Sequence, residues 1–165
     1  MAANNIIATL TPENFKSDNR SHAVLGYRNN HPVLIMPDGT ISRATATGWL
    51  SDRYDGGQID VIVAWMADSD AGNARLEVSI ERLETAGTDI DADAYGTAEA
   101  QTIAVPATSG VIKYSTWNLT AGELDSLAAG EMFRLMIRRI ANDADVTDTT
   151  VGKVYILGVK LVDNA

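Results

Sequence analysis

The stretch TDIDADAYG carries three carboxylates, Asp89, Asp91 and Asp93, at alternate positions of one short segment. Calcium takes about six to eight oxygen ligands, so three carboxylates in a tight loop could supply part of its coordination shell. An EF-hand loop also needs a glycine at its sixth position and a glutamate at its twelfth, and counting from Asp89 these positions hold Ala94 and Ala100. The spacing therefore excludes an EF-hand. We expect a solvated loop without metal, and an unrelated calcium site remains the alternative.

Residue types that most catalytic and metal sites require are scarce. The chain has no cysteine and only two histidines, so a disulfide framework, a thiolate metal site and a cysteine nucleophile are all excluded. A hydrolytic triad needs a histidine beside a serine and an acid, and no GxSxG motif is present. Neither GxxxxGK nor GxGxxG occurs, so no phosphate-binding loop is indicated. We expect a protein that is not an enzyme and has no cofactor.

Aromatic side chains offer one candidate for ligand binding. Trp49 and Tyr54 lie close to an Asp-Gly-Gly turn, and exposed aromatic rings there could form a carbohydrate-binding face. The simpler interpretation places Trp49, together with Trp65 and Trp117, in the core or between sheets, because large aromatic residues are usually buried. Both interpretations stay open at this point.

Three arginines, Arg134, Arg138 and Arg139, form a basic stripe in a chain with only 13 basic residues. They could pair with the protein's own surplus of acids across a neighbouring strand. They could also lie in a subunit interface, where arginine is enriched and a partner could supply the carboxylates.

Composition limits the class of protein that must position these residues. A chain of 165 residues, 45% apolar and 21% charged, suits a single globular domain. The net charge of −9 argues against a nucleic-acid partner, which usually requires a basic face. No window approaches the roughly 18 apolar residues that span a bilayer, and the N-terminus lacks the features of a secretory signal. We therefore expect no nucleic-acid partner and no membrane contact.

Alternating apolar residues predict strands along most of the chain. In RLEVSIERLE, Leu76, Val78 and Ile80 alternate with polar residues, which is typical of a strand with one buried face. Similar runs separated by turns predict an all-β fold, an antiparallel β-sandwich of jelly-roll type. One short helix is expected in TAGELDSLAAG, where Thr120 and Glu123 have the spacing of a capping box.

The first residues differ from the rest of the chain. They are polar and irregular, with the asparagine, serine and aspartate content of loops. The predicted organisation is an extended N-terminal arm over residues 1–32 and a β-sandwich domain over residues 33–165.

Three segments together suggest a family: ERLETAGTDIDADAYGTAEAQT, LDSLAAGEMFRLMIRRIANDADVTDT and VYILGVKLV. In this combination the chain resembles jelly-roll capsid decoration (cement) proteins and related small virion proteins of tailed bacteriophages. The resemblance implies a structural protein that assembles with itself, most often as a homotrimer and sometimes as a dimer, on the outer surface of the capsid. There it would bridge neighbouring subunits of the major capsid protein. The N-terminal arm would make the capsid contact, with its apolar anchors at Ile6, Ile7, Leu10 and Phe15.

The same resemblance also covers tail and fibre modules. The alternative function is therefore a receptor- or glycan-binding module of a phage tail fibre, with Trp49 and Tyr54 as its candidate binding residues.

Overall fold

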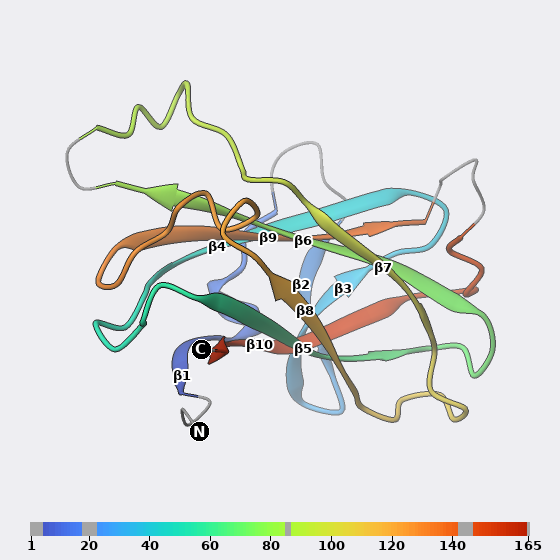
Figure 1. Cartoon of the computed structure of the whole chain (residues 1–165). Coiled ribbons are helices and arrows are strands. Elements are labelled where there is room, and N and C mark those ends of the chain that lie inside the picture. The colour runs from blue at the N-terminus through green and yellow to red at the C-terminus, as the bar shows by residue number, and fades with distance from the viewer. Residues whose placement is uncertain (1–4, 18–22, 85–86, 142–146, 165) are drawn as a thin grey trace.

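The computed structural model describes residues 5–17, 23–84, 87–141 and 147–164 of the chain. Figure 1 shows two β-sheets packed face to face. In the described residues the one helical element is a short 3-10 turn, η1 (Pro12–Asn14). The strands are β1 (Ile6–Leu10), β2 (Val24–Arg28), β3 (His31–Met36), β4 (Ile41–Trp49), β5 (Gln58–Ala67), β6 (Asn73–Leu83), β7 (Glu99–Ala104), β8 (Lys113–Leu119), β9 (Met132–Ile140) and β10 (Val154–Asn164).

All strand pairs are antiparallel. Sheet A has the order β2-β3-β10-β5-β8, and β1 also pairs with β10. Sheet B has the order β4-β9-β6-β7. Long β10 pairs with β5 along one side and with β3 and then β1 along the other, so it ties the N-terminal strands to the centre of sheet A. The predicted all-β antiparallel sandwich is confirmed.

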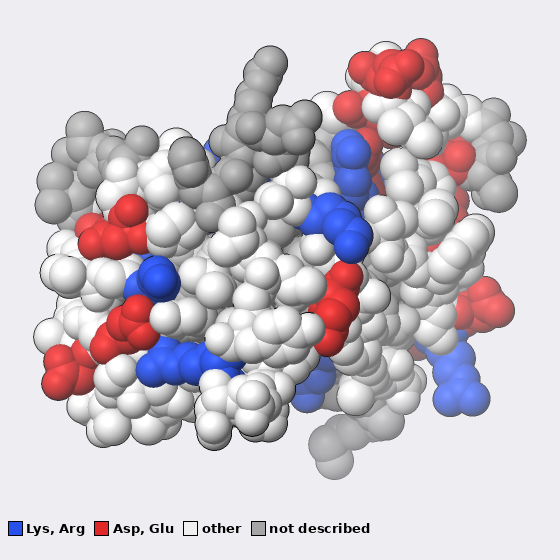
Figure 2. All heavy atoms as spheres, turned by 180° about the vertical axis from the view of Figure 1, so that it is seen from behind, with Lys and Arg blue, Asp and Glu red and all other residues white. Residues whose placement is uncertain are grey.

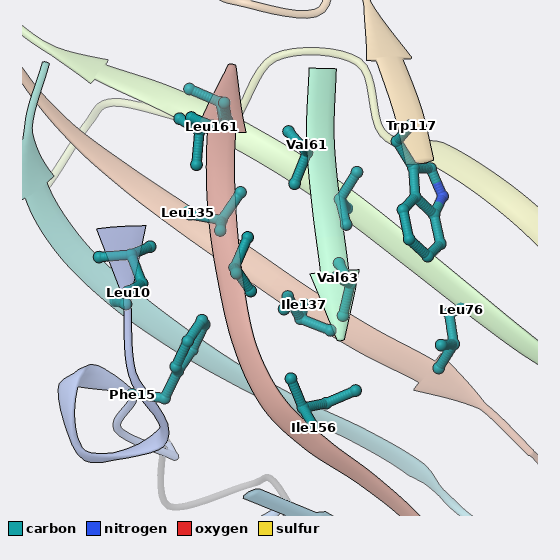
Figure 3. Close-up of a cluster of buried hydrophobic side chains, with 14 of the residues drawn as sticks. Leu10, Phe15, Val61, Val63, Leu76, Trp117, Leu135, Ile137, Ile156 and Leu161 are labelled. Carbon is teal, nitrogen blue, oxygen red and sulfur yellow. The ribbon is translucent and has the colours of Figure 1, made fainter. Parts of the chain in front are cut away.

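The core lies between the two sheets and follows the predicted alternation. Leu76, Val78 and Ile80 of β6 are fully buried, and Val78 and Ile80 lie opposite Ile137 and Leu135 of β9. Figure 3 shows side chains from both sheets meeting in this layer. Burial of each such aliphatic side chain contributes about 1.5–3 kcal/mol, so the alternation is enough to fix which face of each strand turns inward.

The predicted N-terminal arm is corrected by the structure. Leu10 lies opposite Val159 in the β1–β10 pair, and Ile7, Leu10 and Phe15 are each no more than 4% exposed. Leu10 and Phe15 lie within the core cluster (Figure 3). Only Ile6 of the four predicted anchors is exposed. The described residues before position 33 thus belong to the sandwich, because β1 and β2 pair within sheet A and the side chains of Ile7, Leu10 and Phe15 complete its core.

The predicted helix at residues 120–130 is also wrong. The capping interactions do form: the Thr120 hydroxyl and backbone N–H both donate to the Glu123 carboxylate, at 2.7 and 2.5 Å. However, Asp125 and Ser126 have φ values of 53° and 58°, and this left-handed conformation ends the turn before a helix can propagate. The Asp125 carboxylate instead accepts a hydrogen bond from the Arg82 backbone N–H at 3.0 Å. Within the described ranges, no helix has the length and apolar character needed to cross a bilayer.

Candidate functional site

Trp49 is the one tryptophan whose side chain lies on the surface. It is 64% exposed, whereas Trp65 and Trp117 are fully buried in the core. As the last residue of β4, Trp49 lies opposite Met132 of β9, which in turn lies opposite Leu83 of β6. These three side chains form one row on the outer face of sheet B, at the end of the sheet where β4 stops.

An apolar hollow lies over this row. Its volume is about 200 Å³, and Ile90 of the β6–β7 loop, 68% exposed, lines it together with Trp49. Its full lining consists of Trp49, Leu83, Glu84, Thr88, Ile90 and Met132.

A second, polar hollow adjoins the first. It has a volume of about 360 Å³, and it shares Glu84 and Thr88 with the apolar hollow. Its other charged lining residues are Arg82, Asp89, Asp93 and Asp125. We call the two hollows together the Trp49 cleft. It thus has an apolar half with an exposed indole ring and a polar half with several carboxylates.

Arg82 and Glu131 hold the base of the polar half in place. The Arg82 guanidinium donates to both oxygens of the Glu131 carboxylate, at 2.7 and 2.6 Å. Hydrogen bonding by Arg82 is the main reason that the pKa of Glu131 lies below its usual value. The hydrogen bond from the Ala128 backbone N–H lowers this pKa further. The hydrogen bond to Glu131 also raises the pKa of Arg82. Arg82 is therefore neutralised by its own partner, and the remaining charge of the polar half is negative.

Carboxylates of the aspartate loop line one wall of the cleft. The Asp89 carboxylate accepts from the Asp91 backbone N–H at 3.1 Å, and the Asp93 carboxylate from Ala94 N–H at 2.9 Å. Asp89 and Asp93 line the polar half, whereas Asp91 does not. Across the described residues, no group of three or more acidic, histidine or cysteine side chains is arranged to hold a metal ion. Figure 2 shows acidic side chains gathered at the tip of this loop, at the upper right.

Tyr54, the predicted partner of Trp49, does not belong to the cleft. It is 5% exposed and packs in the core cluster, and its hydroxyl donates to the Gly57 carbonyl at 2.6 Å. Burial, with the nearby Asp163 carboxylate, raises its pKa. A ring enclosed in this way cannot stack on a ligand, so the Tyr54 prediction is corrected.

The arginine stripe follows the first of its two predicted interpretations. Arg134 forms an ion pair with the buried Glu81, and Arg138 pairs with Glu77 at 2.7 Å, both across the β6–β9 pair. Arg139 is fully buried and pairs with Asp148 at 3.0 Å, so it cannot contribute a surface to another subunit.

Arg134 has a second relation, to the cleft. Arg134 lies two residues after Met132 on β9, so it points to the same outer face of sheet B, about 7 Å along the strand from the row that holds Trp49. The guanidinium lies over the ring of Tyr95 at 4.8 Å and remains 30% exposed. Arg134 thus lies one row away from the apolar hollow, with its guanidinium paired with Glu81.

Sequence patterns could not assemble the cleft because it depends on strand register. Trp49, Met132 and Leu83 are distant in sequence and meet only when β4, β9 and β6 pair. One local signal exists in Ile90, a single large apolar residue between two aspartates of an otherwise polar loop. An isolated exposed aliphatic residue in such a loop is a reason to look for a contact surface there.

No protein family matches this sequence, and no curated protein does. Solved structures with a similar fold are carbohydrate-binding modules. A family 35 module from Clostridium thermocellum has a TM-score of 0.57 at 8% identity, covering 93% of this chain and 95% of that one. A CBM28 module specific for non-crystalline cellulose has a TM-score of 0.52 at 9% identity, covering 93% and 89%.

A third structure is the CBM36-1 domain of a multidomain xylanase from the hindgut metagenome of Trinervitermes trinervoides. It has a TM-score of 0.50 at 11% identity and covers 96% of this chain and 97% of that one. At these identities the similarity establishes the fold. The jelly-roll prediction is thereby confirmed, and the similarity is to carbohydrate-binding modules. The three structures lend no support to the predicted capsid role. The chain shares its jelly-roll β-sandwich fold with carbohydrate-binding modules.

Proposed function

We propose that this chain is a glycan-binding module and that the Trp49 cleft is its binding site. The observation that carries the proposal is the exposure of Trp49 beside a polar hollow, in a chain whose other two tryptophans are fully buried. Leaving 64% of an indole side chain in water forgoes the stabilisation that burial would give, so a role in contact with a ligand is favoured.

The apolar half of the cleft suits one face of a sugar ring. The C–H groups of a pyranose form an apolar face that can stack on an indole ring, which combines a flat apolar surface with a polar N–H. Met132, Leu83 and Ile90 extend the apolar contact around Trp49. An apolar pocket with a few polar groups at its edge is the usual form of a small-ligand site.

The polar half suits hydroxyl groups rather than acidic groups. Carboxylates accept hydrogen bonds from hydroxyl donors, and Glu84, Asp89, Asp93 and Asp125 supply several acceptors. Arg82 offsets only part of their charge because its main partner is Glu131, at 2.6 Å, and it reaches Glu84 at 3.4 Å. A polyanionic glycan would meet like charges in the cleft, so we expect neutral glycans to be preferred.

Fold similarity supports the proposal at the level of class. The compared structures are carbohydrate-binding modules, one of them specific for non-crystalline cellulose. A glycan receptor is also what the tail-fibre alternative predicted from the sequence would require. The capsid-cementing role, with the major capsid protein as partner and a location on the virion surface, stays a prediction. The contact with the major capsid protein would have to lie elsewhere on the molecule, since three of the four predicted arm anchors are in the core.

Affinity electrophoresis against a panel of soluble polysaccharides tests the proposal. We expect retardation by at least one neutral polysaccharide, such as a xylan or a β-glucan, and none by a polyuronate. Trp49→Ala should abolish the retardation, whereas Val151→Ala, which changes another highly exposed apolar residue, should not. If no neutral polysaccharide retards the protein, or if Trp49→Ala binds normally, the proposal is wrong.

A further inference from the structure

The edge strand β2 exposes an unusual share of the apolar surface. It lies at one end of sheet A and pairs on one side with β3. In the described residues eleven large apolar side chains are exposed, and three of them fall on these five residues: Val24 at 51%, Leu25 at 45% and Tyr27 at 72%. An exposed apolar edge strand is a template for pairing with another strand, which natural proteins usually block with charges or proline.

The chain itself covers part of the other sheet edges. The carbonyl of Thr116 on β8 accepts from the Gln101 side chain at 2.8 Å, and the carbonyl of Ala104 on β7 accepts from Lys113 Nζ at 2.7 Å. On β4, the backbone N–H and C=O of Thr45 both pair with Lys16, at 2.9 and 2.8 Å. Strand β2 differs from these edges in the density of its exposed apolar side chains: three within five residues, against Ile41 and Trp49 in the nine residues of β4 and Tyr114 in the seven of β8.

The β2–β3 hairpin presents this edge rigidly. Asn29 and Asn30 have φ values of 48° and 64°, as in the two-residue turns that match the twist of a hairpin. Arg28 then joins the hairpin to the rest of sheet A: it pairs with Asp68 at 3.0 Å and lies over the ring of Tyr155 at 4.7 Å. A fixed edge loses little conformational entropy when a second strand pairs with it.

We infer that β2 pairs antiparallel with β2 of a second copy of this chain, so that the two A sheets become one continuous sheet in a homodimer. The sequence VLGYR places the apolar side chains of Leu25 and Tyr27 at equal distances on either side of its central Gly26. With a two-fold axis at Gly26, Leu25 of each copy lies opposite Tyr27 of the other. Leu25 and Tyr27 are two residues apart, so they share one face of the strand, and the two Leu–Tyr pairs form one apolar cluster.

A two-fold axis makes both halves of such an interface identical, which is the commonest arrangement of soluble homo-oligomers. The strand carries no acidic residue, so the net charge of −9 opposes the contact only through long-range repulsion. Salt screens that repulsion, and the dimer should therefore be stronger at higher ionic strength. The inference differs from the homotrimer that the family resemblance implies, and the mass of the assembly distinguishes the two.

Sedimentation equilibrium of the full chain measures this mass directly. We expect concentration-dependent association toward twice the chain mass of 17.6 kDa. The variant Leu25→Lys/Tyr27→Lys places like charges opposite each other across the two-fold axis and should sediment as a monomer with an unchanged circular dichroism spectrum. Val151→Lys, a charge placed at another exposed apolar position, should associate like the unaltered chain.

Disulfide trapping tests the register, since the natural chain has no cysteine. An equimolar mixture of Leu25→Cys and Tyr27→Cys proteins should oxidise mainly to the mixed dimer, because positions 25 and 27 face each other. A monomer at all concentrations, a trimeric mass, or association that survives Leu25→Lys/Tyr27→Lys would overturn the inference. Equal amounts of the two homodimers and the mixed dimer would overturn the register at Gly26.

Discussion

The guanidinium of Arg139 and the carboxylate of Asp148 form a two-pronged ion pair in which both side chains are almost completely buried. Nε and Nη2 of Arg139 each donate to a different oxygen of Asp148 at 3.0 Å. The same guanidinium donates to the backbone carbonyls of Met36, Thr150 and Gly152. Arg139 of β9 therefore fixes the segment before β10 and the end of β3 against the sandwich.

Loss of this arginine should be among the most damaging single changes in the protein. Arg139→Met leaves the Asp148 carboxylate buried without its partner, and breaking a buried pair in this way costs about 3–5 kcal/mol. Urea unfolding of the variant measures the loss. Arg28→Met is the control, because the side chains of Arg28 and its partner Asp68 are 31% and 39% exposed; we expect a loss of about 1 kcal/mol or less. Equal losses for the two variants would contradict this account of Arg139.

The strands of the sandwich could be predicted because their side chains alternate with a period of two. Leu76, Val78 and Ile80 face the core as expected, since a shift by one residue would place Glu77 and Glu81 between the two sheets instead, away from the arginines of β9 that pair with them. Both wrong expectations depend on left-handed residues other than glycine. Asn29 and Asn30 form a hairpin turn within the predicted arm, and Asp125 and Ser126 end the turn that begins at Thr120.

Only part of the site could be predicted from sequence. Trp49 was identified by its residue type, and it lies in the cleft. Tyr54 was chosen for its nearness to Trp49 in sequence, yet the turn between β4 and β5 directs its ring into the core. Met132, Leu83 and Ile90 were missed because strand register, and not sequence spacing, brings them to Trp49.

Two glycines with positive φ should respond differently to alanine. Gly72 has φ 93°, and a Cβ there would lie 2.6 Å from the Thr149 carbonyl oxygen. Gly39 has φ 68° and no atom within 4 Å of a Cβ. Gly39→Ala should cost only the left-handed strain of about 1–2 kcal/mol. Gly72→Ala adds a backbone clash and should lower the free energy of unfolding by more. Thermal unfolding compares the two, and a Gly39→Ala loss as large as that of Gly72→Ala would contradict the steric explanation.

The Arg82–Glu131 pair should make stability depend on pH. Since Arg82 lowers the pKa of Glu131 in the folded state, the pair stabilises the fold fully above the unfolded value near 4.5 and loses this contribution as pH falls through the lower folded value. Glu131→Gln should therefore be less stable than the unaltered chain at neutral pH, and the difference should shrink below about pH 4.5.

Urea unfolding of both proteins over a pH series checks this expectation. A difference between them that stays constant down to the most acidic pH would show that Glu131 contributes by its shape and not by its charge.

The most direct test of the Trp49 cleft is the NMR signal of its indole N–H during titration with a neutral oligosaccharide that the polysaccharide panel identifies. The chain has three tryptophans, and Trp49→Phe assigns the signal by its disappearance. We predict a saturable shift of the Trp49 signal, while the signals of the buried Trp65 and Trp117 stay in place. Saturable binding that leaves the Trp49 signal unmoved would contradict the assignment of this cleft as the glycan site.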